Sequence, residues 1–256
     1  MVHRNRLTRL ADDHEVDAQT VERDYVLTHV LVGIARQAGS DRMAFKGGTA
    51  LRLCFFSDYR YSADLDFSLT GGMSKDEAIQ VVHEATAAVA SEIGFPHLLV
   101  REDGTRIEYI GPLGSKPREV KLDLADDELV ITTARVDVLQ RYEDQPPASV
   151  LAYTLDEIAA EKLRCVMQRM QARDLFDVHE LFVERGVDLE QVWPDFELKA
   201  RHKQKDPARF AESFERRISS WKKVWDDEME THVPLDVRPG FGHVERKVRR
   251  ALRAHL

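Results

Sequence analysis

Hydrophobic positions follow two different periods in the first part of the chain. Apolar residues that recur every three to four positions predict helices, and strict alternation of apolar and polar residues predicts strands. Helices are predicted over residues 21–38, 49–56 and 75–93. Strands are predicted over residues 64–69, 98–101, 106–110 and 120–125.

The pattern changes after the turn sequence at residues 145–147 (QPP). Helical spacing then predominates, over residues 155–171, 175–185, 189–199, 207–226 and 244–255. We therefore predict an α+β, bilobed protein. Residues 1–147 would form a mixed-sheet lobe with flanking helices, and residues 148–256 a C-terminal helical lobe.

Charge is distributed unevenly along the 256 residues. The net charge is −8, from 37 Lys and Arg against 45 Asp and Glu, which does not favour general adhesion to nucleic acid or anionic membranes. Residues 199–223 nevertheless contain nine basic and three acidic residues, and residues 238–256 contain six basic and one acidic. These two basic segments are candidates for contacts with phosphates.

Other features limit the class of protein. No window approaches the roughly 18 apolar residues of a membrane span, and no signal-type apolar region follows the polar start, so we expect a soluble, cytoplasmic protein. Cys54 and Cys165 lie in apolar-periodic segments without the spacing of a disulfide framework or zinc site. We expect both to be buried thiols.

Two glycines precede the helix predicted from residue 49. Gly47 and Gly48 would leave backbone N–H groups free at the positive end of that helix, an arrangement that suits a phosphate. The alternative is an ordinary turn in which Thr49 caps the helix.

Paired carboxylates follow in the strand at residues 64–69. The period of two places Asp64 and Asp66 on one face, while Leu65 and Phe67 point into the core. A few hard oxygen ligands beside a phosphate-binding loop describe a Mg²⁺ site completed by nucleotide phosphates and water. The alternative is an amphipathic edge strand with solvated acids.

A second strand, at residues 120–125, repeats the alternation. Lys121 and Asp123 face away from the apolar positions, so a third carboxylate and a cation could join the first pair. Three carboxylates on neighbouring strands suit phosphoryl or nucleotidyl transfer, in which two hold metal ions and the third helps to activate the attacking hydroxyl.

The helix at residues 155–171 carries Lys162 on its apolar stripe. Its ammonium could snorkel to solvent, or it could meet the triphosphate of a nucleotide across a cleft between the lobes. Asp174 precedes the next predicted helix and is placed to act as its N-cap.

Several of these motifs resemble those of one family. Residues 46–51 (KGGTAL) and 60–67 (RYSADLDF) resemble the first motif of the AbiEii/AbiGii toxin family of nucleotidyltransferases, which are similar to the MenT toxins and form the toxin half of type IV-like toxin–antitoxin systems. The resemblance continues in residues 22–25 (ERDY), 121–123 (KLD), 160–163 (AEKL) and 173–177 (RDLFD). It covers about residues 20–185 and implies a nucleotidyltransferase-like fold.

The resemblance also implies roles for individual residues. Asp64 and Asp66 would bind Mg²⁺, with NTP as co-substrate. The catalytic set implied by the family's four motifs is Asp64, Asp66, Asp123, Lys162 and Asp174. The residues implied to bind the nucleotide are Lys46, Gly47, Gly48, Thr49, Arg60, Ser62 and Lys121. The loop has Gly48-Thr49 where many nucleotidyltransferases have Gly-Ser, but it retains the hydroxyl.

The function implied is transfer of a nucleoside monophosphate from an NTP to an RNA acceptor, the tRNA 3′ end, which would block translation. A cognate antitoxin protein would neutralise this activity, and we expect a monomer. The alternatives are nucleotidyl transfer to a small molecule or protein side chain, and a non-catalytic binding module. The facing carboxylates argue against the last, because a binding module has no need of them.

Overall fold

The computed structural model describes residues 1–114 and 116–256. The chain divides into two compact units, Met1–Tyr153 and Thr154–Leu256. The division falls later than the expected position after Pro147, because the intervening residues form a further strand of the first unit's sheet.

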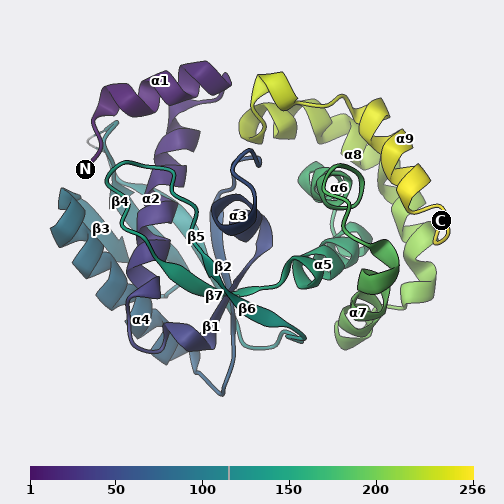
Figure 1. Ribbon diagram of the computed structural model, residues 1–256, viewed down its shortest axis with the longest axis horizontal. Coiled ribbons are helices and arrows are strands. Elements are labelled where there is room, and N and C mark those ends of the chain that lie inside the picture. The colour runs from purple at the N-terminus through teal and green to yellow at the C-terminus, as the bar shows by residue number, and fades with distance from the viewer. Residues whose placement is uncertain (115) are drawn as a thin grey trace. The chain divides into compact units, whose positions relative to one another are not determined.

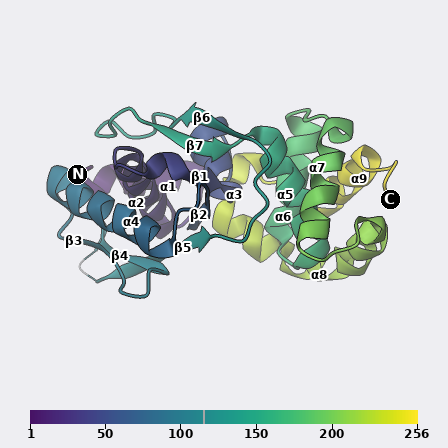
Figure 2. The ribbon, with the colours of Figure 1, turned by 90° about the horizontal axis from the view of Figure 1, so that it is seen from below.

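A mixed β-sheet organises the first unit (Figure 1). Seven strands of the described chain take part, in the order β3-β4-β5-β2-β1-β7-β6. β2 pairs in parallel with β5, and β1 with β7, whereas the remaining neighbours are antiparallel. Figure 2 shows β1 and β2 between the β6–β7 and β3–β4 ends of the sheet. The strands are β1 (Met43–Lys46), β2 (Asp64–Leu69), β3 (His97–Val100), β4 (Arg106–Ile110), β5 (Arg118–Ala125), β6 (Thr133–Asp137) and β7 (Ser149–Tyr153).

The helices of the first unit follow from capping and apolar spacing. α2 and α4 pack side by side, and α4 also contacts β3 and β5 (Figure 1). Ser74 and Glu77 form a capping box that begins α4, since each side chain bonds the other residue's backbone N–H. The helices are α1 (Arg4–His14), α2 (Ala18–Ala35), α3 (Gly47–Ala50) and α4 (Lys75–Val89), and a π-helical turn continues α3 over Leu51–Phe55.

The second unit is built from helices around an aromatic core. Trp221 and Trp225 of α8 are buried with Phe196, Phe210 and Phe214. The helices are α5 (Leu155–Gln168), α6 (Ala172–His179), α7 (Leu189–His202), α8 (Phe210–His232) and α9 (Phe241–Ala251). No helix in the described part of the chain is long and apolar enough to cross a membrane.

The fold class agrees with the prediction, a mixed sheet with helices and a helical C-terminal region. The four predicted strands are present, and α1, β1, β6 and β7 were not predicted. β1 is buried on both faces and therefore lacks alternation, while β6 has no fully buried residue. Cys54 and Cys165 are buried free thiols, as expected.

Candidate active site

Three carboxylates of the first unit share one face of the sheet. In the parallel pair of β2 and β5, Asp66 lies opposite Asp123, and Asp64 lies opposite Lys121. Paired residues of adjacent strands face the same side, and alternate residues of a strand do so too. Leu65 is buried on the other face. The sheet therefore brings Asp64, Asp66 and Asp123 together, as the alternation predicted.

Lys121 supplies positive charge to this group. Its Nζ donates a hydrogen bond to Asp123 Oδ2 at 2.8 Å. That bond raises the pKa of Lys121, and the charges of Asp123, Asp66 and Asp64 raise it further, although partial burial acts in the opposite direction. One ammonium is thus within electrostatic range of all three carboxylates, and it stays protonated at neutral pH.

The glycine loop packs directly against one of these carboxylates. Gly47 has a φ of +79°, in the left-handed region that favours glycine. A Cβ atom at this position would lie 2.6 Å from Asp66 Oδ2. Glycine is therefore favoured here both by the backbone and by the close approach of Asp66, which would have to move to accommodate a larger residue.

The next residue, Gly48, lies against two other candidate residues. A Cβ atom there would be 2.7 Å from an Nη atom of Arg60 and 3.3 Å from Ser62 Oγ. Arg60 is buried and donates to the carbonyl of Tyr61 at 3.1 Å. The guanidinium, a hydroxyl and the N–H groups at the start of α3 thus lie around one glycine loop.

Thr49 connects this loop to β2. Its Oγ1 donates to the backbone carbonyl of Asp64 at 2.5 Å, so the hydroxyl holds the carboxylate strand in place. The alternative interpretation of Thr49 as an N-cap is wrong, because α3 begins at Gly47 and Lys46 occupies the N-cap position. Lys46 lies opposite Asp66 in the register of β1 and β2, and its ammonium lies 3.6 Å from Glu128 Oε1.

The donor set is chemically suited to a hard divalent cation. Carboxylate oxygens are preferred ligands of Mg²⁺, which usually takes one or two from the protein and the rest from phosphates and water. Among the residues that the structure describes, no group of three or more His, Cys, Asp or Glu side chains is gathered closely enough to hold a metal ion. Two carboxylates of β2 completed by a substrate's phosphates fit both observations.

The remaining candidates meet in the second unit. Lys162 of α5 is buried, and its ammonium lies 2.8 Å from Asp177 Oδ2 and 3.5 Å from Asp174 Oδ1, both of which are fully buried carboxylates. The alternative prediction, that the Lys162 ammonium reaches solvent, is therefore wrong. The ammonium is instead held between two carboxylates of α6.

Asp174 is not an N-cap, because α6 begins at Ala172 with Gln171 as its N-cap. Its two oxygens accept hydrogen bonds from Arg169, at 2.6 and 2.8 Å. Sequence reasoning missed both Arg169 and Asp177 as members of this cluster. The spacing of Asp177, three residues after Asp174 on one helix, was the available signal.

One family model and two solved structures are similar to this chain. The family model described as "Nucleotidyl transferase AbiEii toxin, Type IV TA system" matches residues 29–250. Among solved structures, the chain is similar to MenT4, a nucleotidyltransferase toxin from Mycobacterium tuberculosis H37Rv, with a TM-score of 0.61 and 20% identity over 100% of this chain and 99% of that one. It also matches an antigenic nucleotidyltransferase-like protein from Paracoccidioides brasiliensis, with a TM-score of 0.38 and 15% identity over 70% and 93% of the two chains. None of the curated proteins compared with it shows a significant match.

Proposed function

The chain belongs to the AbiEii family of toxin nucleotidyltransferases, and from that premise we propose that it transfers a nucleoside monophosphate from an NTP to the 3′ hydroxyl of an RNA, the tRNA 3′ end. The observation that carries the proposal is the packing of Gly47 against Asp66, on the same sheet face as Asp64 and Asp123. A phosphate-binding loop and three carboxylates are the parts that this reaction requires.

Each part has a distinct task in the proposed reaction. Asp64 and Asp66 would hold Mg²⁺, which would neutralise the phosphate charge. The N–H groups of the glycine loop, together with Arg60 and Ser62, would orient the triphosphate. Asp123, which accepts a hydrogen bond from Lys121, would accept the proton of the attacking 3′ hydroxyl.

Lys162 and Asp174 remain in the proposed catalytic set. Because the Lys162 ammonium is held by Asp174 and Asp177, any contact with substrate would involve the cluster as a whole. Removal of Lys162 would therefore affect folding as well as activity. Removal of a carboxylate of β2 would affect activity alone.

The RNA partner would meet the basic residues of the second unit, although fewer are available than their number implies. Lys199 forms a buried ion pair with Glu157, Arg209 pairs with Glu212, and Arg217 is buried. In contrast, Lys247, Arg250 and Arg253 line a hollow of about 490 Å³, and the described residues include no ion-pair partner for them. We propose these three as contacts for RNA phosphates. Action on tRNA would place the protein in the cytoplasm. We also propose that it is a monomer and, as a member of a toxin family, that a cognate antitoxin inhibits it.

The decisive test is incubation of the purified protein with each α-³²P-labelled NTP and total RNA, with and without Mg²⁺. We expect label on RNA in the presence of Mg²⁺ and none with the variant Asp66→Asn, which preserves the shape of the side chain. Label on a small molecule or on protein would overturn the RNA acceptor. Absence of any labelled product would overturn the reaction.

A further inference from the structure

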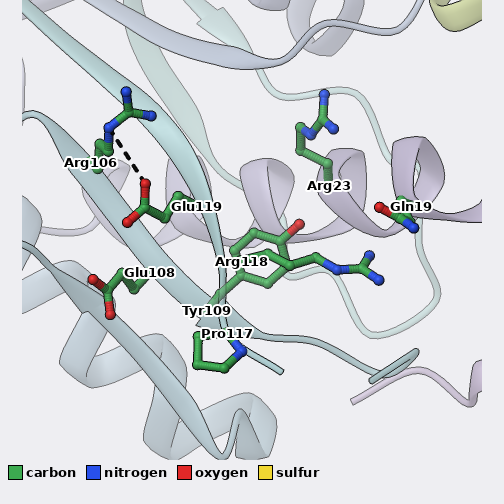
Figure 3. Close-up of a pocket in the computed structure, with 8 residues that line it drawn as sticks. All are labelled: Gln19, Arg23, Arg106, Glu108, Tyr109, Pro117, Arg118 and Glu119. Carbon is green, nitrogen blue, oxygen red and sulfur yellow. Dashed lines mark ion pairs between the residues drawn. The ribbon is translucent and has the colours of Figure 1, made fainter. Parts of the chain in front are cut away.

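A polar pocket of the first unit is lined by residues of β4, β5 and the N-terminal part of α2. Its volume is about 570 Å³. Figure 3 shows strand residues on one side, Gln19 and Arg23 of α2 on the other, and Arg118 and Tyr109 between them. The pocket is lined by Gln19, Arg23, Arg106, Glu108, Tyr109, Pro117, Arg118 and Glu119.

Strand register places Arg106, Glu108 and Glu119 of this pocket on the carboxylate face, whereas the adjacent pair of Tyr109 and Arg118 faces the other side, toward α2. Arg106 of β4 lies opposite Lys121 of β5, and Lys121 lies opposite Asp64 of β2. Glu108 and Glu119 form the next pair that faces the same side. Arg106 thus lies one strand away from Lys121, the residue that donates to Asp123. Glu119 lies two residues from Lys121 along β5, which is about 7 Å at the usual rise of a strand.

The pocket and the glycine loop lie on opposite sides of the carboxylates. Across the sheet the order is β4-β5-β2-β1, and the loop follows β1. In nucleotidyl transfer the attacking and leaving oxygens are roughly in line through the phosphorus. If the leaving pyrophosphate is held by the glycine loop, the acceptor must approach from the side of β5 and β4, where the pocket lies.

The arginines of the pocket are suited to phosphates. Arg118 is fixed by a 2.8 Å contact with buried Glu22, while Arg106 lies 3.5 Å from Glu119. Within the described chain, Arg23 has no hydrogen-bond or ion-pair partner. The guanidinium of Arg23 is therefore open to planar, bidentate contacts with phosphate oxygens.

We propose that this pocket binds the single-stranded 3′-terminal nucleotides of the acceptor RNA, with Arg23 and Arg106 on backbone phosphates. Glu108 and Glu119 accept hydrogen bonds from base amino groups, as carboxylates do in nucleic-acid recognition. This inference rests on the proposed function, and it adds the acceptor's binding site and its chemical form.

The test compares Arg23→Gln/Arg106→Gln with the matched control Arg101→Gln. Arg101 pairs with the same Glu119, at 2.6 Å, but does not line the pocket. Two probes are used, namely bulk tRNA with an intact 3′ end and the same tRNA with its single-stranded terminal nucleotides removed. Affinities are measured over a salt series, beside KM values for NTP and melting temperatures.

We expect the double variant to bind intact tRNA about tenfold more weakly, with a salt slope smaller by about 0.7 for each phosphate that the arginines no longer neutralise. The trimmed tRNA should bind wild type and double variant equally, and Arg101→Gln should behave as wild type. Unchanged tRNA affinity, or a change confined to the KM for NTP, overturns the pocket assignment even if RNA is labelled. If no RNA is labelled by the wild type, the proposed function fails, and this inference fails with it.

Discussion

At Gly47, backbone conformation and the geometry of the candidate active site depend on each other. Its positive φ and its contact with Asp66 are separate constraints, and both favour glycine. Gly72 offers a comparison, because it has a φ of +72° but no atom within 4 Å of an added Cβ. Substitutions at the two positions therefore distinguish the effect of backbone strain from the effect of displacing the Asp66 carboxylate.

Gly47→Ala should lower transfer activity at least tenfold, because the added methyl group displaces the Asp66 carboxylate. The left-handed backbone should also cost about 1–2 kcal/mol of stability. Gly72→Ala should be destabilised to a similar degree but keep normal activity. Urea unfolding and the RNA-labelling assay measure the two effects, and equal activities of the two variants would contradict this role of Gly47.

Lys162→Met should destabilise the protein by about 3–5 kcal/mol, because it leaves Asp177 without its buried cation. The double variant Lys162→Met/Asp177→Leu should recover most of that stability, since Asp174 keeps Arg169. Both variants should lack transfer activity. A wild-type melting temperature for the single variant would show that the buried pair does not matter for stability.

At the scale of elements, an ion pair joins α2 to the π-helical turn after α3. Arg52 donates through two nitrogens to Asp24, and the Tyr142 hydroxyl donates to the same carboxylate at 2.8 Å. Burial alone would raise the pKa of Asp24, but the charges of Arg52 and Arg141 and these hydrogen bonds hold it below its ordinary value. This pair fixes the helix that carries the glycine loop.

The lowered pKa of Asp24 determines whether the free energy of unfolding rises or falls with pH. In the wild type, Asp24 contributes stability above its unfolded pKa of about 3.9, and this contribution is lost as the pH falls through the lower folded value. In Arg52→Met, burial should raise the folded pKa above 3.9, so the free energy of unfolding should decrease as the pH rises from about 4. The decrease is at most about 1.4 kcal/mol per pH unit.

Urea unfolding between pH 4 and 8 checks this expectation. Arg36→Met is the control, because Arg36 forms an exposed pair with Glu92 and directly follows the helix that carries Asp24. Its pH profile should parallel that of the wild type. A parallel profile for Arg52→Met as well would mean that Asp24 does not depend on Arg52.

For the whole molecule, the arrangement of charge matters more than its sum. The chain is acidic overall, yet Lys247, Arg250 and Arg253 of α9 and the following turn have no ion-pair partners in the described structure. Many other arginines and lysines are already neutralised by nearby acids. Charge content along the sequence therefore overstates the surface that RNA could use.

Replacing Lys247, Arg250 and Arg253 by Gln should weaken RNA binding and lower the salt slope by up to about 0.9 per phosphate contact. The control removes the same number of charges at Arg36, Arg42 and Arg201, each paired with a glutamate. Fluorescence anisotropy over a salt series distinguishes the two variants. Equal affinities would eliminate the α9 surface as an RNA contact, and weakened antitoxin binding instead would assign it to that partner.

Local pattern was sufficient for β2 and β5, because a half-buried strand must alternate whatever it pairs with. The same pattern placed Asp64 and Asp66 on one face and left Lys121 and Asp123 together on another strand. β1 escaped detection, since burial on both faces removes the alternation that identifies a strand.

Only the tertiary structure decided which residues from different elements lie together. The register of β2 against β5, the pocket formed by β4, β5 and α2, and the burial of Lys162 between Asp174 and Asp177 all depend on how elements pack. Spacing along one element determines which side chains share a face. It carries no information about which face of which element lies opposite, because that choice is set by the free energy of packing the whole core.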